Sequence, residues 1–317
     1  MVLTQLFLAR KAAVLYALSI LTSALLATHT FEGLFHVVTP SFVAQVTTSA
    51  MHLPYGGEMG LSATVSLEKM GASIKLLTHD PCDTGAHIVT CPVGESHEIK
   101  LISFRGCRFD LSSPKESLID AWTNISFSTQ SLRKYLADPD FDGWAHRGYV
   151  VRAESVIALL AEDLKTTKEK TIIPLFAGHS MGGGVAKLVA WALYKRGIIS
   201  RPLVCTAGTP PILCPRAAKQ FSKEFASAYI HAHDPKDPIV ALNKDPLLRM
   251  FFGGFSHPEG LLIPAQSGKN ETLYFAHSIE NYTAALLSLA IQATSALRFV
   301  GKHRLESAVK HKYRAKL

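Results

Sequence analysis

Ile172 to Gly184 reads IIPLFAGHSMGGG and leads directly into the apolar run VAKLVAW at residues 185–191. An apolar strand, a sharp glycine turn and a helix form the context in which a G-x-S-x-G sequence becomes a nucleophile elbow. The glycines two residues before and two residues after Ser180 leave space where a Cβ would clash with a tight backbone. We therefore predict that Ser180 is a nucleophile held at the tip of a strand. The alternative is a glycine-rich turn with a purely structural role.

Strand and helix patterns alternate on both sides of this elbow. Runs rich in β-branched and aromatic residues predict strands, and apolar residues at helical spacing predict helices. The expected strands are residues 86–91, 99–104, 202–206 and 228–232, and the expected helices are 118–127, 150–164, one containing 221–225, and 282–299. Such an alternation predicts a parallel sheet wrapped by helices, and 317 residues suffice for one large α/β domain.

The positive charge of the chain is concentrated at its C-terminal end. The formal net charge is +8, and residues 298–317 carry seven Lys or Arg against Glu306 alone, so this tail holds +6 of it. A basic tail can bind anionic lipid headgroups, and the alternative is a solvated terminal helix. Nucleic acid is not an expected partner, because no aromatic platform or recognition motif accompanies the charge.

The two ends of the chain predict different compartments. The apolar run from Ala12 to Ala27 follows Arg10-Lys11 and is shorter than the roughly 20 residues of a spanning helix. Residues 1–30 therefore fit a signal peptide or a membrane anchor, or else a helix packed on the folded domain. The first two alternatives predict a membrane-associated or secretory-pathway protein. The terminal Ala315-Lys316-Leu317 resembles the S-K-L peroxisomal address, which makes peroxisome or glycosome the alternative.

Five cysteines are present without a C-x-x-C pair, which argues against a zinc site. In an oxidising compartment Cys82 could bridge to Cys91, and Cys205 to Cys214. The alternative is that these are free buried thiols.

Further motifs accompany the elbow along the chain. In order they are Phe104-Arg-Gly-Cys107, His146-Arg-Gly-Tyr149, Thr206-Ala-Gly-Thr-Pro-Pro211, Asp237-Pro-Ile-Val240 and His277-Ser-Ile-Glu-Asn-Tyr282. Together they resemble the class 3 lipases, the fungal-lipase-like branch of the α/β-hydrolase fold, over about residues 85 to 295. The double proline and Lys223-Glu-Phe225 are most similar to the diacylglycerol-lipase group. The resemblance implies an α/β-hydrolase domain over residues 31–300, with residues 301–317 as a basic tail.

The resemblance also implies roles for particular residues. His277 is the expected general base for Ser180, and backbone N–H groups of Met181 and Cys107 are the expected oxyanion donors. Asp237 is the preferred acid.

Two alternatives to these assignments remain at this stage. Asp234, which follows the strand at 228–232, is a second candidate for the acid, and His257 is a second candidate for the base. The chain also departs from the family pattern at Cys107, where the family has threonine or serine, and at Val240, where it has proline. No cofactor or metal is expected.

The surroundings of the elbow predict a lipid substrate. Residues 109–122 occupy the place of a movable lid in the family and are largely apolar. We expect a serine hydrolase that cleaves acylglycerol esters of the di- or monoacyl type, with a membrane or lipid-droplet surface as partner. Phospholipase A1 or a general carboxylesterase is the alternative within enzymes, and a non-catalytic lipid-binding or scaffold protein is the alternative outside them.

Overall fold

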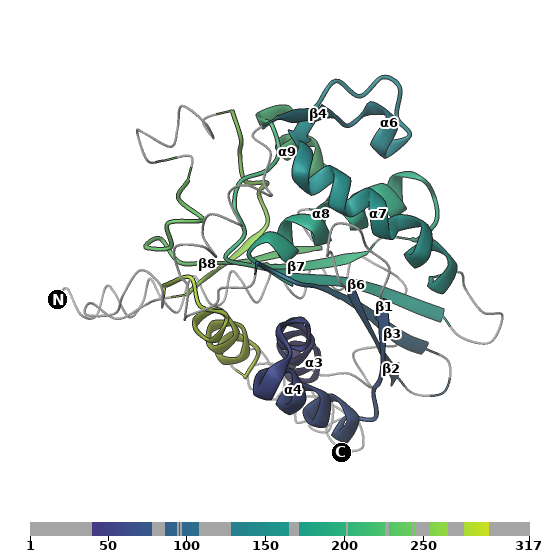
Figure 1. Cartoon of the computed structure of the whole chain (residues 1–317), viewed down its shortest axis with the longest axis vertical. Helices are drawn as coiled ribbons and strands as arrows, with labels where there is room; N and C mark the ends of the chain where they lie inside the picture. The colour runs from purple at the N-terminus through teal and green to yellow at the C-terminus, as the bar shows by residue number, and fades with distance from the viewer. Residues whose placement is uncertain are drawn as a thin grey trace, which may run out of the picture.

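A seven-stranded sheet forms the centre of the protein (Figure 1). The computed structural model describes residues 40–77, 86–93, 95, 97–107, 128–164, 171–200, 202–225, 228–242, 244, 254–265 and 276–291. The strands run in the order β1 (Ser73–Leu77), β2 (Ala86–Val93), β3 (His97–Phe104), β6 (Thr171–His179), β7 (Leu203–Ala207), β8 (Tyr229–His233) and β9 (Leu261–Pro264). β2 is antiparallel to both of its neighbours, β1 and β3, and from β3 onward every neighbouring pair is parallel. The predicted, mostly parallel central sheet is confirmed.

The strands that the sequence did not predict lie at the edges or outside this sheet. Only the last residue of β1 is buried, so this strand lacks the apolar alternation of a half-buried strand. β9 has four residues and pairs with β8 alone. A separate two-stranded sheet, β4 (Thr129–Ser131) with β5 (Trp144–His146), is equally short. Strands this short carry too few residues to show a period of two.

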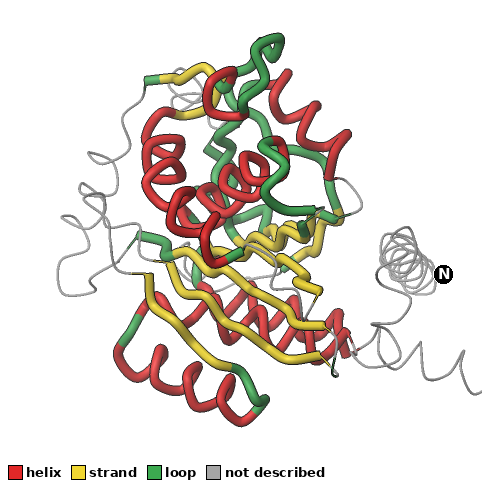
Figure 2. The backbone as a smooth tube through the Cα atoms, turned by 90° about the vertical axis from the view of Figure 1, so that its right-hand side faces the viewer, coloured by secondary structure: helices red, strands yellow, loops and turns green. Residues whose placement is uncertain are grey.

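Helices cover both faces of the sheet (Figure 2). One face carries α7 (Arg147–Asp163), α8 (Met181–Lys195) and α9 (Pro215–Phe225), with α6 (Arg133–Leu136) beside α8. The other carries α3 (Pro40–His52), the short helix η1 (Leu53–Tyr55), α4 (Gly57–Lys69) and a helix at residues 279–291. Each face buries its own apolar cluster against these helices. The predicted helices at 150–164 and around 221–225 are α7 and α9, and the described residues of the last predicted helix are helical.

The elbow lies at the most enclosed part of the molecule. Residues 173–179 of β6 are buried, as expected for a strand covered on both faces of a parallel sheet. α8 is buried from Met181 to Leu193, because it packs between the sheet and α7. A helix enclosed in this way is apolar all round, which residues 181–193 of α8 satisfy except at Lys187.

Several predictions concern segments outside the described residues. These segments are residues 1–30, the helix at 118–127, the lid at 109–122 and the tail at 301–317. In the ranges that the structure does describe, no helix is both long and apolar enough to cross a membrane. Cys91, Cys205 and Cys214 are free thiols, so the bridges Cys82–Cys91 and Cys205–Cys214 are both absent.

Candidate active site

Four parallel strands end side by side, and each is followed by one of the sequence motifs. Phe104 at the end of β3 pairs with Gly178 of β6, and His179 pairs with Ala207 at the end of β7. Ala207 in turn pairs with Ala232 near the end of β8. Because ligand sites of open α/β sheets form outside the carboxyl ends of the strands, this edge is where the motifs can act together.

The elbow holds Ser180 in a strained backbone conformation. Its φ is 55° and its ψ is −126°, which a residue with a Cβ rarely adopts. Its N–H donates to the Ala207 carbonyl at 2.8 Å. A Cβ on Gly178 would lie 2.3 Å from the Gly182 carbonyl carbon, and one on Gly182 would lie 2.2 Å from the Phe104 oxygen. The two glycines therefore allow the strand, the turn and the helix to approach closely enough to hold this conformation.

Ser180, His277 and Asp237 form one hydrogen-bonded chain. Ser180 Oγ lies 3.0 Å from His277 Nε2, and His277 Nδ1 lies 2.7 Å from Asp237 Oδ2. All three side chains are buried. In this arrangement the imidazole can take the hydroxyl proton while the carboxylate orients the ring and stabilises the imidazolium.

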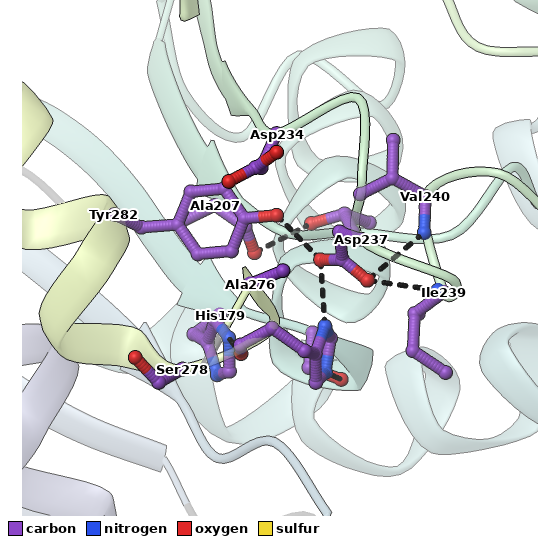
Figure 3. A network of polar contacts seen from close by, with 12 residues as sticks. His179, Ala207, Asp234, Asp237, Ile239, Val240, Ala276, Ser278 and Tyr282 are labelled. Atoms are coloured by element: carbon purple, nitrogen blue, oxygen red, sulfur yellow. Dashed lines mark hydrogen bonds and ion pairs between the residues drawn. The ribbon is translucent and has the colours of Figure 1, made fainter. Parts of the chain in front are cut away.

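Asp237 is held from several sides. Its Oδ1 accepts the backbone N–H of Ile239 at 2.8 Å and that of Val240 at 3.4 Å, as drawn in Figure 3. One carboxylate oxygen, Oδ1, therefore stabilises the Asp-Pro turn, while the other, Oδ2, contacts His277. With valine at position 240, this residue donates an N–H that proline could not donate.

Asp234, the alternative acid, has other partners. Its Oδ1 accepts the Lys236 N–H at 2.9 Å, and its Oδ2 accepts the Asn281 amide at 3.0 Å. These contacts fasten the loop after β8 to the helix at 279–291. The geometry favours Asp237 as the residue that orients His277.

His257, the alternative base, lies elsewhere. Its Nε2 donates to the Val240 carbonyl at 3.1 Å, and its ring stacks on His231 with centroids 5.3 Å apart. Burial lowers the pKa of His257 to about 3, so it is neutral at ordinary pH. Among the described residues, the ring that lies within hydrogen-bond distance of Ser180 Oγ is that of His277.

Tyr282 is a member of the network that the sequence did not reveal. Its hydroxyl donates a short hydrogen bond to Asp237 Oδ2, the oxygen that also faces His277 (Figure 3). Burial, together with the negative charge of Asp237, raises the pKa of Tyr282, so the phenol keeps its proton and remains a donor. A tyrosine five residues after His277 gives no local signal of this role, because the contact depends on how the last helix packs.

The predicted oxyanion donors lie beside Ser180. Met181 is the first residue of α8, and the first N–H groups of a helix have no acceptor within it. Cys107 follows β3, and its Sγ lies 3.8 Å from Met181 Sδ. Burial raises the pKa of the Cys107 thiol, so the side chain is neutral. The structure therefore brings both residues to the nucleophile, with a thiol where the family has a hydroxyl.

In the described part of the chain no cluster of His, Cys, Asp or Glu is arranged to hold a metal ion. The chemistry that the described groups can perform is nucleophilic attack by a serine with acid–base help from a histidine.

Comparisons with known proteins agree with this architecture. A family model described as Lipase (class 3) matches residues 101–245, a range that includes Ser180 and Asp237 and ends before His277. No curated protein matches the chain.

Solved structures extend the comparison beyond that range. The Rhizomucor miehei triacylglyceride lipase superposes with a TM-score of 0.51 and 20% identity, covering 70% of this chain and 79% of the lipase. A mutant form of the Penicillium cyclopium protein MDLA superposes with a TM-score of 0.54 and 20% identity, covering 74% of this chain and 81% of MDLA. A triacylglycerol lipase whose catalytic centre is described as a serine protease triad superposes with a TM-score of 0.54 and 18% identity. The superposition covers 78% of this chain and 94% of that lipase. The fold is therefore the α/β-hydrolase fold, and the resemblance of this chain to the class 3 lipases is confirmed.

Proposed function

We propose that this protein is a serine hydrolase that cleaves carboxylic ester bonds of acylglycerol lipids. The single observation that carries the proposal is the buried chain from Ser180 through His277 to Asp237, with contacts of 3.0 and 2.7 Å. A serine hydroxyl is a weak nucleophile until a neighbouring base takes its proton, and this chain supplies such a base.

The reaction follows from the positions of these groups. Ser180 Oγ attacks the ester carbonyl carbon while His277 Nε2 takes its proton, and N–H groups of Met181 and Cys107 stabilise the resulting oxyanion. His277 then gives that proton to the departing alcohol, which leaves an acyl-enzyme. A water molecule, deprotonated by His277, attacks the acyl carbon, and collapse of the second tetrahedral intermediate releases the fatty acid and restores Ser180. Each oxyanion donor contributes about 2.7–4 kcal/mol to the stability of the transition state.

The substrate class is supported by similarity. The matching family model describes lipases, and two of the similar structures are named as lipases of triacylglycerides or triacylglycerols. The double proline at 210–211 and the segment 223–225 resemble the diacylglycerol-lipase group, and this resemblance favours a di- or monoacylglycerol as the preferred substrate.

Hydrolysis of p-nitrophenyl butyrate, together with labelling by a fluorophosphonate, tests the mechanism. Ser180→Ala should lower the rate at least about 10³-fold and abolish labelling, because the nucleophile is lost. Ser103→Ala is a matched control, since Ser103 is a buried serine on β3 whose hydroxyl has no partner in the part of the chain that the structure describes. Persistent labelling of a folded Ser180→Ala protein would overturn the assignment.

A substrate panel tests the acylglycerol class. Tri-, di- and monoacylglycerols and a phosphatidylcholine, all with oleoyl chains, should be offered in matched mixed micelles. We expect the diacylglycerol or the monoacylglycerol to give the highest kcat/KM. Preferred release of the sn-1 acyl chain from the phospholipid would indicate a phospholipase A1 instead.

A further inference from the structure

Tyr55 connects the N-terminal helical layer to the catalytic centre. It is the last residue of η1, between α3 and α4, and precedes the region matched by the family model. Its hydroxyl oxygen lies 2.6 Å from Nδ1 of His179, the residue directly before Ser180. A residue far away in the sequence therefore contacts the nucleophile elbow.

His179 continues this connection to the general base. Its Nε2 lies 2.9 Å from the backbone carbonyl oxygen of His277, and the two imidazole rings are 4.9 Å apart. The side chain is buried. One imidazole thus contacts Tyr55 with one nitrogen and the backbone of His277 with the other.

The direction of both hydrogen bonds follows from charge. Burial and the neighbouring His277 lower the pKa of His179 well below its usual value, so the ring is neutral and carries one N–H. A carbonyl oxygen only accepts, so the proton is on Nε2 and Nδ1 must accept from Tyr55. Burial raises the pKa of Tyr55, so its hydroxyl remains available as the donor.

Gly106 allows the loop at 105–107, which carries the expected oxyanion donor, to lie against the Tyr55 hydroxyl. A Cβ on Gly106 would lie 2.5 Å from the Tyr55 hydroxyl oxygen and 2.9 Å from the His179 carbonyl oxygen. The Gly106 backbone also opposes the rise in the pKa of the Tyr55 phenol, as a close polar neighbour does. Because Cys107 comes next, the position of its N–H depends on this contact.

We propose that Tyr55 and His179 are positioning residues of the hydrolase site. They fix the His277 backbone and the loop at 105–107 relative to Ser180, and neither takes part in the bond changes. This inference rests on the proposed function and adds to it two residues that act through others.

The first test removes one hydroxyl. Tyr55→Phe keeps the ring and loses the donor to His179. Kinetics on p-nitrophenyl butyrate should show kcat lowered about tenfold with KM within about twofold, because sub-ångström misplacement of reacting groups slows chemistry more than it weakens binding. Tyr135→Phe is the matched control, because Tyr135 is buried in the opposite layer and its hydroxyl contacts no polar partner within the described ranges. It should leave both constants unchanged.

A double-mutant cycle tests whether the two residues act as one unit. His179→Phe removes both hydrogen bonds and should lower kcat by about 100-fold. Removing the Tyr55 hydroxyl from His179→Phe should lower kcat by much less than the tenfold expected in the wild type, since the acceptor on His179 is already lost and only the contact with Gly106 remains. Multiplying losses would show that the residues act independently and would overturn the inference.

The remaining outcomes separate this inference from the function on which it rests. Thermal unfolding of every variant shows how much of each protein is folded. If the loss of kcat in Tyr55→Phe is no larger than its unfolded fraction, Tyr55 contributes only to packing, and the inference is overturned. An active wild type with an unchanged Tyr55→Phe variant would overturn the inference alone. A wild type whose hydrolysis does not depend on Ser180 would overturn the proposed function, and the inference with it.

Discussion

Replacing Lys187 with methionine should stabilise the protein, and more so as the pH falls from 10 to 7. Lys187 lies on α8, is fully buried, and its Nζ has no hydrogen-bond partner among the described residues. Burial lowers its pKa from 10.5 to about 7. Nearby His231 and His257 are themselves kept neutral by burial and provide no negative charge to offset the ammonium.

The magnitude follows from the two pKa values. Between pH 7 and 10.5 the unfolded chain binds a proton at Lys187 that the folded chain binds weakly, so lowering the pH favours unfolding. Each tenfold difference in proton affinity is worth about 1.4 kcal/mol, which makes the cost of folding around this lysine roughly 4 kcal/mol at pH 7 and about 1 kcal/mol at pH 10. Methionine fits a lysine-shaped space without a charge. We expect Lys187→Met to gain roughly 2–4 kcal/mol at pH 7, or about 5–10 °C in Tm.

Urea unfolding of wild type and Lys187→Met at pH 7, 8, 9 and 10 measures this gain. Lys195→Met is the control on the same helix, because Lys195 is paired with Asp138 at 2.9 Å and with Glu224 at 3.6 Å. The control should lose stability or leave it unchanged. A Lys187→Met protein that is no more stable than wild type at pH 7, or a gain that does not shrink toward pH 10, would refute the reasoning.

Asp237→Asn should lower kcat/KM on p-nitrophenyl butyrate by about 10³–10⁴-fold while Asp234→Asn costs much less, because Asp237 is the carboxylate that lies 2.7 Å from His277 Nδ1; comparable losses would contradict this. Tyr282→Phe should lower kcat about tenfold and the free energy of unfolding by about 1.5–3 kcal/mol, since a buried hydrogen bond to Asp237 is lost, and steady-state kinetics with urea unfolding would detect both. Cys107→Ser should raise kcat up to about tenfold by restoring a hydroxyl donor at the oxyanion, and an unchanged or lower kcat would argue against a side-chain contribution there. Deleting residues 1–30 should release the protein from the membrane fraction of fractionated cells, whereas peroxisomal import that depends on the last three residues would show that they form the address.

Much of the fold and part of the site could be predicted because the deciding interactions are local. The strand, turn and helix around Ser180 are specified within about twenty residues, since glycine spacing and apolar runs act on neighbouring backbone. The order of strands and helices likewise fixed the sheet class, and with it the edge where the motifs meet. Met181 followed directly from its place after the nucleophile.

The tertiary structure alone decided which groups face one another. Asp234 and Asp237 follow the same strand three residues apart, and only the turn between them determines which one reaches His277. Tyr55 and Tyr282 meet the site from 124 and 45 residues away, a separation over which sequence patterns carry no pairing information. The burial of Lys187 could not be predicted from local sequence either, because the elements that cover its helix lie elsewhere in the chain. Local sequence sets backbone conformation, but the partners of a buried polar group are set by packing, which brings distant residues within hydrogen-bond distance.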